Sequence, residues 1–209
     1  MGRHDEKGAH VREYDVRRAT EEDIEPLSKT LAAALLNDPV TMWLFPDADR
    51  RRHMAARFFE WTLRTTSMPL GEVWTTNDLG AVALWAPPDR WQLKLGDQAR
   101  LLPSALGLFR SRTLRILIGF NKVEVKHPKD PPHWYLYFIG TRPEGQSHGR
   151  GGALLSHMLE RADADGHPAY LEASTQRVVP FYARHGFREM ERFALKNGPE
   201  WSLMWRDPR

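Results

Sequence analysis

Residues 134–152 read WYLYFIGTRPEGQSHGRGG, an apolar run followed by a glycine-rich turn. The run from Trp134 to Thr141 is rich in aromatic residues and predicts a strand. After the turn, apolar residues recur at helical spacing and predict a helix, at Leu154, Leu155, Met158, Leu159 and Ala162. The segment therefore predicts a strand, a glycine-rich loop and a helix in direct succession.

The loop between this strand and this helix has the composition of an anion-binding site. Its pattern is Gln146-x-x-Gly149-x-Gly151, and glycines let backbone N–H groups approach a phosphate closely. The positive end of the helix dipole adds to this attraction. The segment lacks the Gly-Lys-Ser/Thr of a Walker P-loop and the third glycine and later acid of a dinucleotide fingerprint. Neither of those two nucleotide-binding motifs is therefore expected here.

A second distinctive segment is PFYARHGF at residues 180–187. Residues 178–185 predict a short helix, and Gly186 fits its C-terminal cap. The remaining sequence predicts further strands at 14–18, 72–76, 81–85, 169–173, 187–193 and 201–206. Asn77-Asp78-Leu79-Gly80 is typical of a hairpin turn between the second and third of these.

Helices are expected in three further regions. The first begins with Thr20 as N-cap and ends near Asn37, because Pro39 follows. The second spans about 49–66. The region 91–126 predicts two helices separated near Pro103 or Gly107.

The chain has 209 residues, no cysteine and a formal net charge of +3. Without cysteine, disulfides, thiolate metal sites and a cysteine nucleophile are excluded. The nine histidines show no metal-binding spacing, so no metal is expected. The charges are scattered, residues 1–10 are too polar for a signal peptide, and the longest apolar stretch, 114–120, is too short to span a bilayer. We expect a cytoplasmic monomer or homodimer without a nucleic-acid or membrane partner.

The glycine-rich loop and the second segment together resemble the signature of the GNAT superfamily of N-acetyltransferases. The superfamily's Gln/Arg-x-x-Gly-x-Gly/Ala pattern after an apolar strand is matched by Gln146, Gly149 and Gly151. Its later Tyr-x-x-x-Gly-Phe pattern is matched at 182–187. Shorter stretches resemble the puromycin N-acetyltransferase-like branch, at 17–20, 30–34, 81–85, 127–129 and 171–174.

This resemblance implies an α/β (α+β) fold with a mixed, largely antiparallel central sheet of about six or seven strands flanked by helices. It also implies a V-shaped splay between the two central strands, beside a bulge in the strand before the loop. The whole chain, 1–209, is expected to form one domain. Residues 1–12 are expected to be a flexible N-terminus and 134–187 the acetyl-CoA-binding core.

The resemblance also implies which residues bind the cosubstrate, acetyl-CoA. The pantetheine arm would pair with the strand at Phe138, Ile139, Gly140 and Thr141. The loop would hold the pyrophosphate at Gln146, Ser147, His148, Gly149, Arg150, Gly151 and Gly152. Two positions depart from the family pattern, because Ser147 replaces a frequent glycine and Thr175 replaces a frequent asparagine. Tyr182 would meet the CoA sulfur.

Acyl transfer from a thioester needs a neutral amine, an oxyanion donor and help for the departing thiolate. Tyr182 is the candidate acid, acting through a hydrogen bond that strengthens as charge develops on sulfur. Glu172 is the candidate base, since it lies near the end of the strand that faces the splay, and Asp38 is a weaker alternative. Backbone N–H groups at 138–140 would bind the oxyanion.

The expected function is acetyl transfer from acetyl-CoA to a primary amine of a small molecule, including antibiotic-like amines, by direct attack in a ternary complex. Two alternatives stay open at this point. One is a catalytically silent acyl-CoA-binding sensor, and the other is a protein or peptide N-acetyltransferase. The acceptor pocket is expected in the aromatic-rich first half, with candidate lining residues Trp43, Phe45, Trp61 and Trp85.

Overall fold

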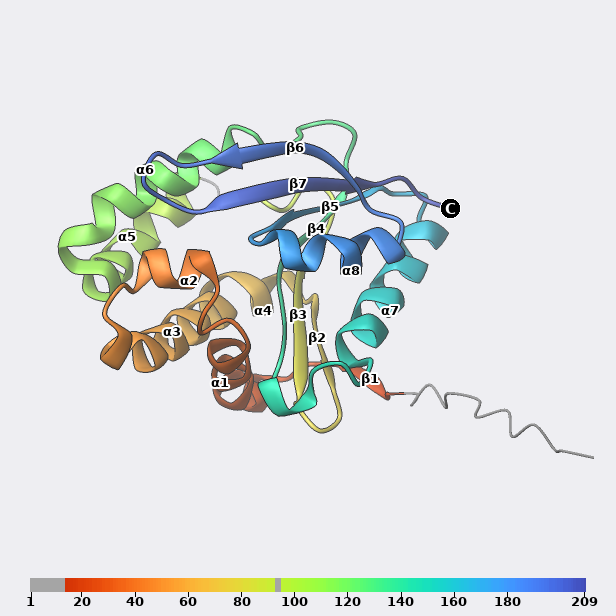
Figure 1. Cartoon of the computed structure of the whole chain (residues 1–209), viewed down its shortest axis with the longest axis horizontal. Coiled ribbons are helices and arrows are strands. Elements are labelled where there is room, and N and C mark those ends of the chain that lie inside the picture. Colours follow the sequence, from red (N-terminus) through yellow and green to blue (C-terminus); the bar gives the residue numbers. More distant parts are fainter. Residues whose placement is uncertain (1–13, 93–94) are drawn as a thin grey trace, which may run out of the picture.

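A computed structural model describes residues 14–92 and 95–209, so the expected flexible segment 1–12 lies outside the described residues. The architecture is a seven-stranded sheet with helices on both faces (Figure 1). The strands are β1 Val16–Arg18, β2 Val73–Thr76, β3 Ala81–Ala86, β4 Trp134–Thr141, β5 Ala169–Ala173, β6 Arg188–Ala194 and β7 Glu200–Arg206. Their order across the sheet is β1-β2-β3-β4-β5-β7-β6.

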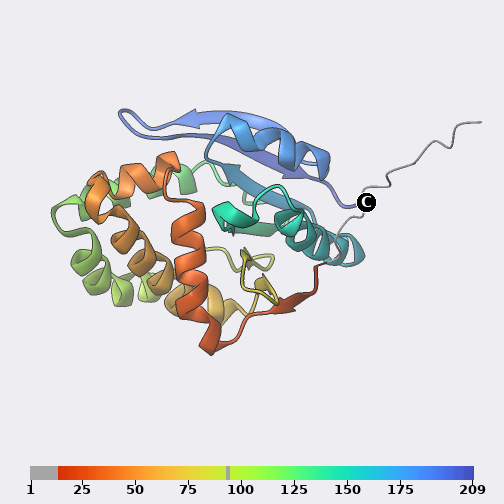
Figure 2. The same cartoon turned by 60° about the horizontal axis from the view of Figure 1, so that its bottom comes forward.

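Among the strands of the described residues, β4 and β5 pair in parallel and the other neighbouring strands are antiparallel. The expected mixed, largely antiparallel sheet flanked by helices is confirmed. The helices are α1 Ile24–Ala34, α2 Pro39–Leu44, α3 Ala48–Thr62, α4 Met68–Leu70, α5 Leu95–Phe109, α6 Thr113–Glu124, α7 Arg150–Ala164 and α8 Val179–Arg184. In Figure 2, α7 and α8 lie on one side of the sheet, while α1, α2, α3, α5 and α6 gather on the other.

The two faces of the sheet bury different residues because side chains alternate along each strand. In β3, Ala81, Ala83 and Trp85 belong to the core under α7. Val82 and Leu84 belong to the core under α1 and α3. All six residues of β3 are buried, as expected for a strand covered on both faces.

The first helix ends earlier than its sequence predicts. Thr20 is the N-cap of a 3-10 turn, Glu21–Asp23, that leads into α1, and its backbone N–H donates to the Asp23 carboxylate at 2.8 Å. The helix α1 ends at Ala34. The chain then starts a new helix, α2, with Pro39 in its first turn and Asp38 as N-cap. Proline suits that position because its missing N–H would have no partner there.

The region 91–126 contains two helices, as predicted, but the break lies at Arg110–Arg112 and not near Pro103 or Gly107. Helix α5 continues through Pro103 to Phe109, where burial of Ala105, Leu108 and Phe109 in the core stabilises the turn after the proline. The helix ends where Arg110 adopts a left-handed backbone with φ of 52°, and a 3-10 turn, Arg110–Arg112, leads into α6. Tertiary packing therefore overrides the local effect of proline.

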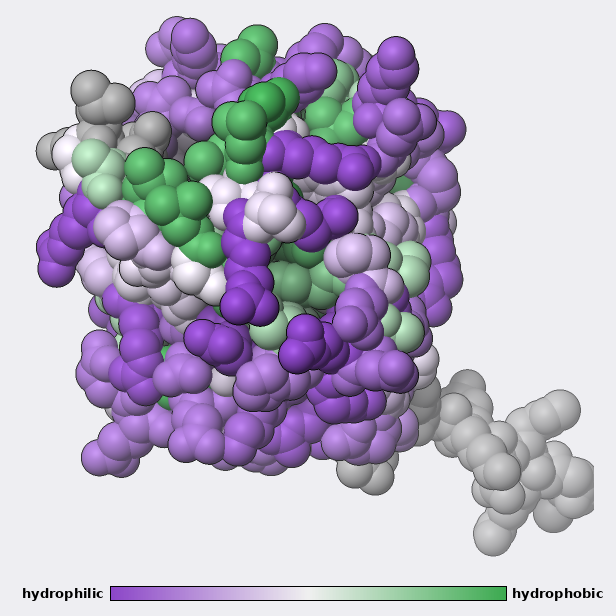
Figure 3. Space-filling view, turned by 90° about the vertical axis from the view of Figure 1, so that its left-hand side faces the viewer, coloured by the Kyte–Doolittle hydropathy of each residue, from purple (hydrophilic) through white to green (hydrophobic). Residues whose placement is uncertain are grey.

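Helices α5 and α6 also present apolar side chains to solvent. Figure 3 looks onto this side of the molecule and shows apolar side chains gathered there. Exposed large apolar residues of the two helices include Leu102, Leu106, Leu114, Leu117 and Ile118. Among the described residues, no helix has the length and apolar character needed to cross a membrane.

Candidate active site

The centre of the sheet splits between β4 and β5. Their pairing consists of three residue pairs, from Trp134 with Ala169 to Leu136 with Leu171. Beyond Leu136, β4 continues to Thr141 and stays paired with β3 alone. The expected V-shaped splay is therefore confirmed, and it exposes the β5-facing edge of residues 137–141.

A bulge in β4 lies at the start of this splay. Leu84 pairs with Phe138 and the next residue, Trp85, pairs with Leu136, so Tyr137 is an extra residue in β4. An extra residue bends and twists a strand locally. The bend turns the last residues of β4 away from β5, which is the geometry that opens the gap.

The glycine-rich loop follows β4 directly and ends at the first turn of α7. Ser147 and Gly149 have positive φ, 63° and 90°, so two left-handed residues lie within three positions. At the start of the helix, the N–H of Ala153 donates to the carbonyl oxygen of Gly149 at 2.9 Å. The N–H groups of residues 150–152 have no intrahelical acceptor and are available to an anion.

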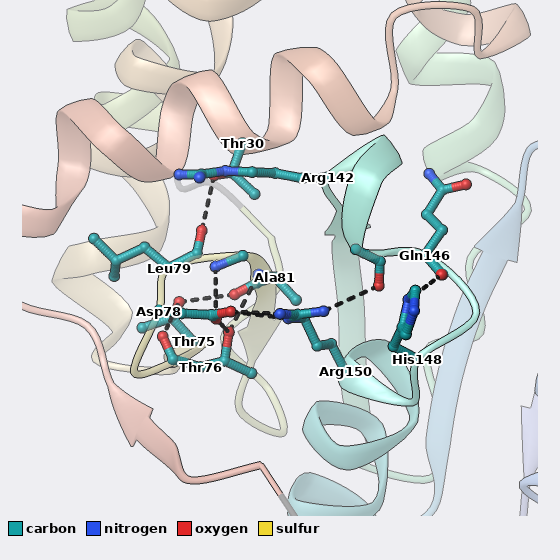
Figure 4. Close-up of polar contacts among 12 residues, drawn as sticks. Thr30, Thr75, Thr76, Asp78, Leu79, Ala81, Arg142, Gln146, His148 and Arg150 are labelled. Atoms are coloured by element: carbon teal, nitrogen blue, oxygen red, sulfur yellow. Dashed lines mark hydrogen bonds and ion pairs between the residues drawn. The ribbon is translucent and has the colours of Figure 1, made fainter. Parts of the chain in front are cut away.

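The polar side chains of this loop bind other groups of the protein, as Figure 4 shows. Arg150 turns back to the β2–β3 turn, where its guanidinium lies 2.6 Å from the Asp78 carboxylate, and it also donates to the carbonyl of Gly145 at 3.3 Å. The Gln146 amide donates to the carbonyl of Thr141. Nδ1 of His148 lies 2.7 Å from the carbonyl of Gln146. The expected cofactor residues of the loop therefore offer mainly backbone groups to a ligand.

Two further observations fit a CoA-like ligand in the splay. A Cβ built on Gly151 would lie 3.4 Å from Oγ1 of Thr141 and 3.8 Å from Phe181, so larger side chains would fill the space between the loop and α8. Oγ1 of Thr175 is buried and has no hydrogen-bond partner among the described residues. A buried hydroxyl without a partner is costly, and a ligand could supply one here.

Tyr182 lies on α8, on the same side of the sheet as α7. It is 8% exposed and packs in the core cluster that contains Leu171 and Phe187. Burial raises the pKa of the Tyr182 phenol, and the charge of Asp38 raises it further. The hydroxyl therefore stays protonated at neutral pH, as a hydrogen-bond donor to sulfur requires.

Asp38 is close enough to Tyr182 for its charge to act on the phenol, although the two are far apart in sequence. The Asp38 carboxylate accepts hydrogen bonds from the hydroxyl of Ser174 and, at 2.8 Å, from the backbone N–H of Val40. Burial raises the pKa of Asp38, while these two hydrogen bonds oppose the change. A carboxyl with a raised pKa is a better proton acceptor for an amine than an ordinary one.

Glu172 occupies the first β5 position after the pairing with β4 ends. Its side chain is 12% exposed and accepts hydrogen bonds from the hydroxyls of Tyr135 at 2.8 Å and Tyr170 at 3.3 Å. Nδ1 of His127 lies 3.6 Å from the same carboxylate. Glu172 is therefore held in place by aromatic side chains, on the sheet face opposite α7.

The predicted aromatic acceptor pocket is corrected in part. Trp85 is fully buried under α7, so it cannot line a pocket. Phe45 is a core residue that packs against Phe58 and Phe109. Trp61 lines a hollow of about 270 Å³ between α3 and α5.

Sequence reasoning missed two parts of this site. Ser174 was not singled out for a role, although a hydroxyl just after a predicted strand end at the splay is a usable signal. His127 and His133 are the other part, since the spacing of the nine histidines gave no reason to place either of them at the site. Among the described residues, no group of three or more His, Asp or Glu side chains is placed to hold a metal ion.

The comparisons with known proteins agree with this geometry. The family model described as acetyltransferase (GNAT) family matches residues 34–187. A relative from Schizosaccharomyces pombe, an uncharacterised N-acetyltransferase, is 25% identical over 181 residues, which cover 82% of this chain and 73% of that protein.

Two solved structures illustrate the range of similarity. A Corynebacterium glutamicum structure, named histone acetyltransferase HPA2 and related acetyltransferase, superposes with a TM-score of 0.71 at 26% identity and covers 94% of this chain and 97% of its own. Arylalkylamine N-acetyltransferase 2 from Aedes aegypti shares the fold, with a TM-score of 0.65 at 10% identity, covering 93% and 99%. This chain belongs to the acetyltransferase (GNAT) family, whose enzymes use acetyl-CoA, and it is an N-acetyltransferase.

Proposed function

We propose that this enzyme transfers the acetyl group of acetyl-CoA to a primary amine of a small molecule, by direct attack within a ternary complex. The observation that carries the proposal is the splay between β4 and β5, which leaves β4 without a partner on that side directly before the loop at the start of α7. Residues 138–141 would pair with the pantetheine arm. The amides of residues 146–152 and the hydroxyl of Thr175 would hold the nucleotide part.

Two carboxylates close to the end of β5, Asp38 and Glu172, support an amine as the acceptor. Asp38 reaches Ser174 at the end of β5, and Glu172 lies two residues earlier on the same strand face. A cationic amine is attracted to such carboxylates before it reacts. An alkylamine with a pKa near 10.4 needs about 4–5 kcal/mol for deprotonation at neutral pH, so one of the two must take its proton.

The reaction forms the amide C–N bond and breaks the thioester C–S bond. We assign the amine proton to Glu172, with Asp38 as the competing acceptor, and the stabilisation of the leaving thiolate to the Tyr182 hydroxyl. The backbone N–H groups at 138–140 would bind the oxyanion. Glu172→Gln and Asp38→Asn separate the two assignments, because loss of the true base should be relieved at high pH and loss of the other should not.

An amine screen tests the proposed function directly. Release of CoA thiol from acetyl-CoA is measured with alkylamines, aromatic amines, aminonucleosides and lysine- or N-terminus-bearing peptides. We expect turnover with small amines. Preference for peptides would instead support protein acetylation, which the histone acetyltransferase name of the C. glutamicum relative makes the rival candidate.

The finer predictions from the sequence are retained as parts of this proposal. They are membership of the puromycin N-acetyltransferase-like branch, one domain spanning the chain, a cytoplasmic location, and a monomer or homodimer with no nucleic-acid or membrane partner. Agmatine and arylalkylamines appear in the names of proteins that share the fold. These names support small amines as the first acceptors to test.

A further inference from the structure

Two aromatic side chains of α8 and its C-cap lie against the first turn of α7. Phe181 and His185 are four positions apart, so they share one face of the helix. A Cβ built on Gly151 would lie 3.8 Å from the ring of Phe181, and one built on Gly152 would lie 3.7 Å from Nε2 of His185. Because glycine has no side chain, no Cβ separates Nε2 of His185 from the start of α7.

The two nitrogens of the His185 ring differ in their partners. Nδ1 lies 2.9 Å from the carbonyl oxygen of Phe181, and because a carbonyl only accepts, Nδ1 carries a proton. Nε2 makes no hydrogen bond with the described residues. In the neutral ring, Nε2 therefore has a lone pair and can only accept a hydrogen bond.

A pyrophosphate also offers only acceptors. The N–H groups of residues 150–152, which have no acceptor within α7, would hold it at the start of the helix. A neutral His185 ring would place its lone pair beside this anion, whereas a protonated ring would donate a charge-assisted hydrogen bond. A cation at the start of a helix is unfavourable without an anion, because the helix dipole is positive there. The proton and the anion therefore favour each other at this position.

The charged side chains around the end of α8 also favour an anion. They come from α7, α8, β6, β7 and the segment after β7, and they are Asp163, Arg184, Arg188, Arg206, Asp207 and Arg209. Each acid of this set is paired with an arginine of the set, whereas Arg184 and Arg209 make no ion pair with the described residues. At the start of α7, the titratable neighbours Arg150 and His148 bind other groups of the protein.

We propose that His185 binds the pyrophosphate of acetyl-CoA through a protonated Nε2, an inference that rests on the proposed function. The ring takes up this proton from solvent as the cosubstrate binds and releases it to solvent as CoA leaves. The Nε2–H bond is the only bond that forms or breaks in this step. His185 touches the cosubstrate away from the reacting atoms, so its effect is on affinity.

The test is calorimetry of binding in the absence of an amine, with acetyl-dephospho-CoA as the ligand. This ligand keeps the pyrophosphate but lacks the 3′-phosphate, whose own titration near pH 6 would add to that of the protein. For an imidazole of ordinary pKa, about 6.5, a tenfold preference of the protonated ring for the anion corresponds to uptake of about half a proton near pH 7. Titrations in two buffers of different ionisation enthalpy measure this uptake. We expect it in the wild type and expect it to be absent in His185→Gln, which keeps an N–H donor but cannot take up a proton.

The affinity itself should follow the same dependence. Between about pH 5.5 and about pH 8.5, the wild-type affinity should fall about tenfold more than that of His185→Gln, and the two should agree within about threefold at the upper end. His157→Gln is the matched control, since His157 lies on α7 and stacks on Trp74. It should follow the wild type at each pH.

An affinity deficit of equal size at every pH would overturn the proposal, because lost packing does not depend on protonation. Equal proton uptake by the wild type and His185→Gln would also overturn it. A pH-linked deficit seen with acetyl-CoA but not with acetyl-dephospho-CoA would place the ring at the 3′-phosphate and contradict the assignment to the pyrophosphate. Should His185→Gln not fold, ¹⁵N spectra of the wild-type ring decide, and a neutral ring in the complex near pH 7 would overturn the proposal.

These measurements separate the inference from the proposed function. Binding with proton uptake at His185, but without turnover of any amine, would support the inference and contradict the proposed function. Failure of the wild type to bind either ligand would overturn both. Turnover with small amines and no proton uptake at His185 would leave the proposed function in place and overturn the inference alone.

Discussion

The carboxylate of Asp38 accepts a hydrogen bond from the hydroxyl of Ser174, which lies 136 positions further along the chain. The contact joins the N-cap residue of α2 to the residue that follows β5, so it bridges two elements beside the splay. Because the charge of Asp38 also raises the pKa of Tyr182, the ionisation of this one carboxyl affects both the acceptor side and the proposed acid.

The raised pKa of Asp38 predicts a pH-dependent stability. Burial holds its folded pKa above the ordinary value of 3.8, so the folded chain binds a proton that the unfolded chain has already released. The contribution of Asp38 to the free energy of unfolding is therefore present below pH 3.8 and is lost as the pH rises through the folded pKa. Relative to the wild type, Asp38→Asn should gain stability between about pH 4 and about pH 7 in urea unfolding.

Glu25→Gln is the matched control for Asp38→Asn. Glu25 is exposed on α1 and paired with Lys29, and its pKa is lowered, first by the hydrogen bond to Lys29. Its removal should change relative stability in the opposite direction with pH. A constant difference between Asp38→Asn and the wild type would contradict a raised pKa at Asp38.

The loop predicts that a side chain at Gly151 weakens acetyl-CoA binding. The Cβ of Gly151→Val fits beside Thr141 and Phe181 in the free protein, but its methyl groups would keep a pyrophosphate away from the amides at the start of α7. Affinity should fall at least tenfold, about 1.4 kcal/mol in calorimetry. Gly149→Val should bind as weakly, and it should also lose stability because φ is +90° there.

Gly107→Val is the control for these glycine variants. A Cβ on Gly107 of α5 meets no atom within 4 Å, so acetyl-CoA affinity should stay at the wild-type value. Unchanged affinity in both loop variants would remove the phosphate-binding role of residues 146–152.

Tyr182→Phe separates catalysis from binding. If the hydroxyl stabilises the thiolate, kcat should fall by roughly 10²–10⁴ while acetyl-CoA affinity stays nearly constant. Single-turnover measurement is required, since slow product release would mask the loss. Tyr14→Phe is the control, because the hydroxyl of Tyr14 is buried without a partner among the described residues. A single-turnover rate within about threefold of wild type would exclude the role of Tyr182.

The ion pair between Arg150 and Asp78 predicts a lowered pKa for the Asp78 carboxyl. The hydrogen bond from Arg150 is the largest cause that lowers the pKa of Asp78 to about 2, so its contribution to stability is present above the ordinary value and is lost as the pH falls towards 2. In Arg150→Ala, the Asp78 pKa followed by NMR should rise towards its ordinary value of 3.8. The pKa of Asp23, which the hydrogen bond from Arg17 lowers to about 2, should not change and serves as an internal control.

Local sequence patterns were sufficient to predict the elements that form the candidate site. The apolar run of β4, the glycines before α7 and the strand at 169–173 each have clear limits in the sequence, and all three agree with the structure. Glycine and proline mark such boundaries because their backbone freedom is unusual. The end of α5 could not be predicted in this way, since it depends on packing of Phe109 and on the left-handed Arg110.

Contacts between residues that are far apart in the sequence could not be predicted either. Arg150 was expected to face the cofactor, but it is paired with Asp78, 72 positions earlier. The aromatic cluster around Glu172 likewise joins residues from β4, β5 and the loop before β4. Residue spacing along one element does not encode such meetings, and they depend on the register of β4 against β5.

Three residue pairs join β4 to β5, and they connect two parts of the sheet. One part contains β1 to β4 and the other contains β5, β7 and β6. A linear ligand with amide groups that binds between the two parts would act as an eighth strand and make the hydrogen bonds that β4 and β5 do not make with each other. Cosubstrate would therefore close the sheet, and its arrival should slow amide exchange most at residues 137–141, where backbone groups now face the gap.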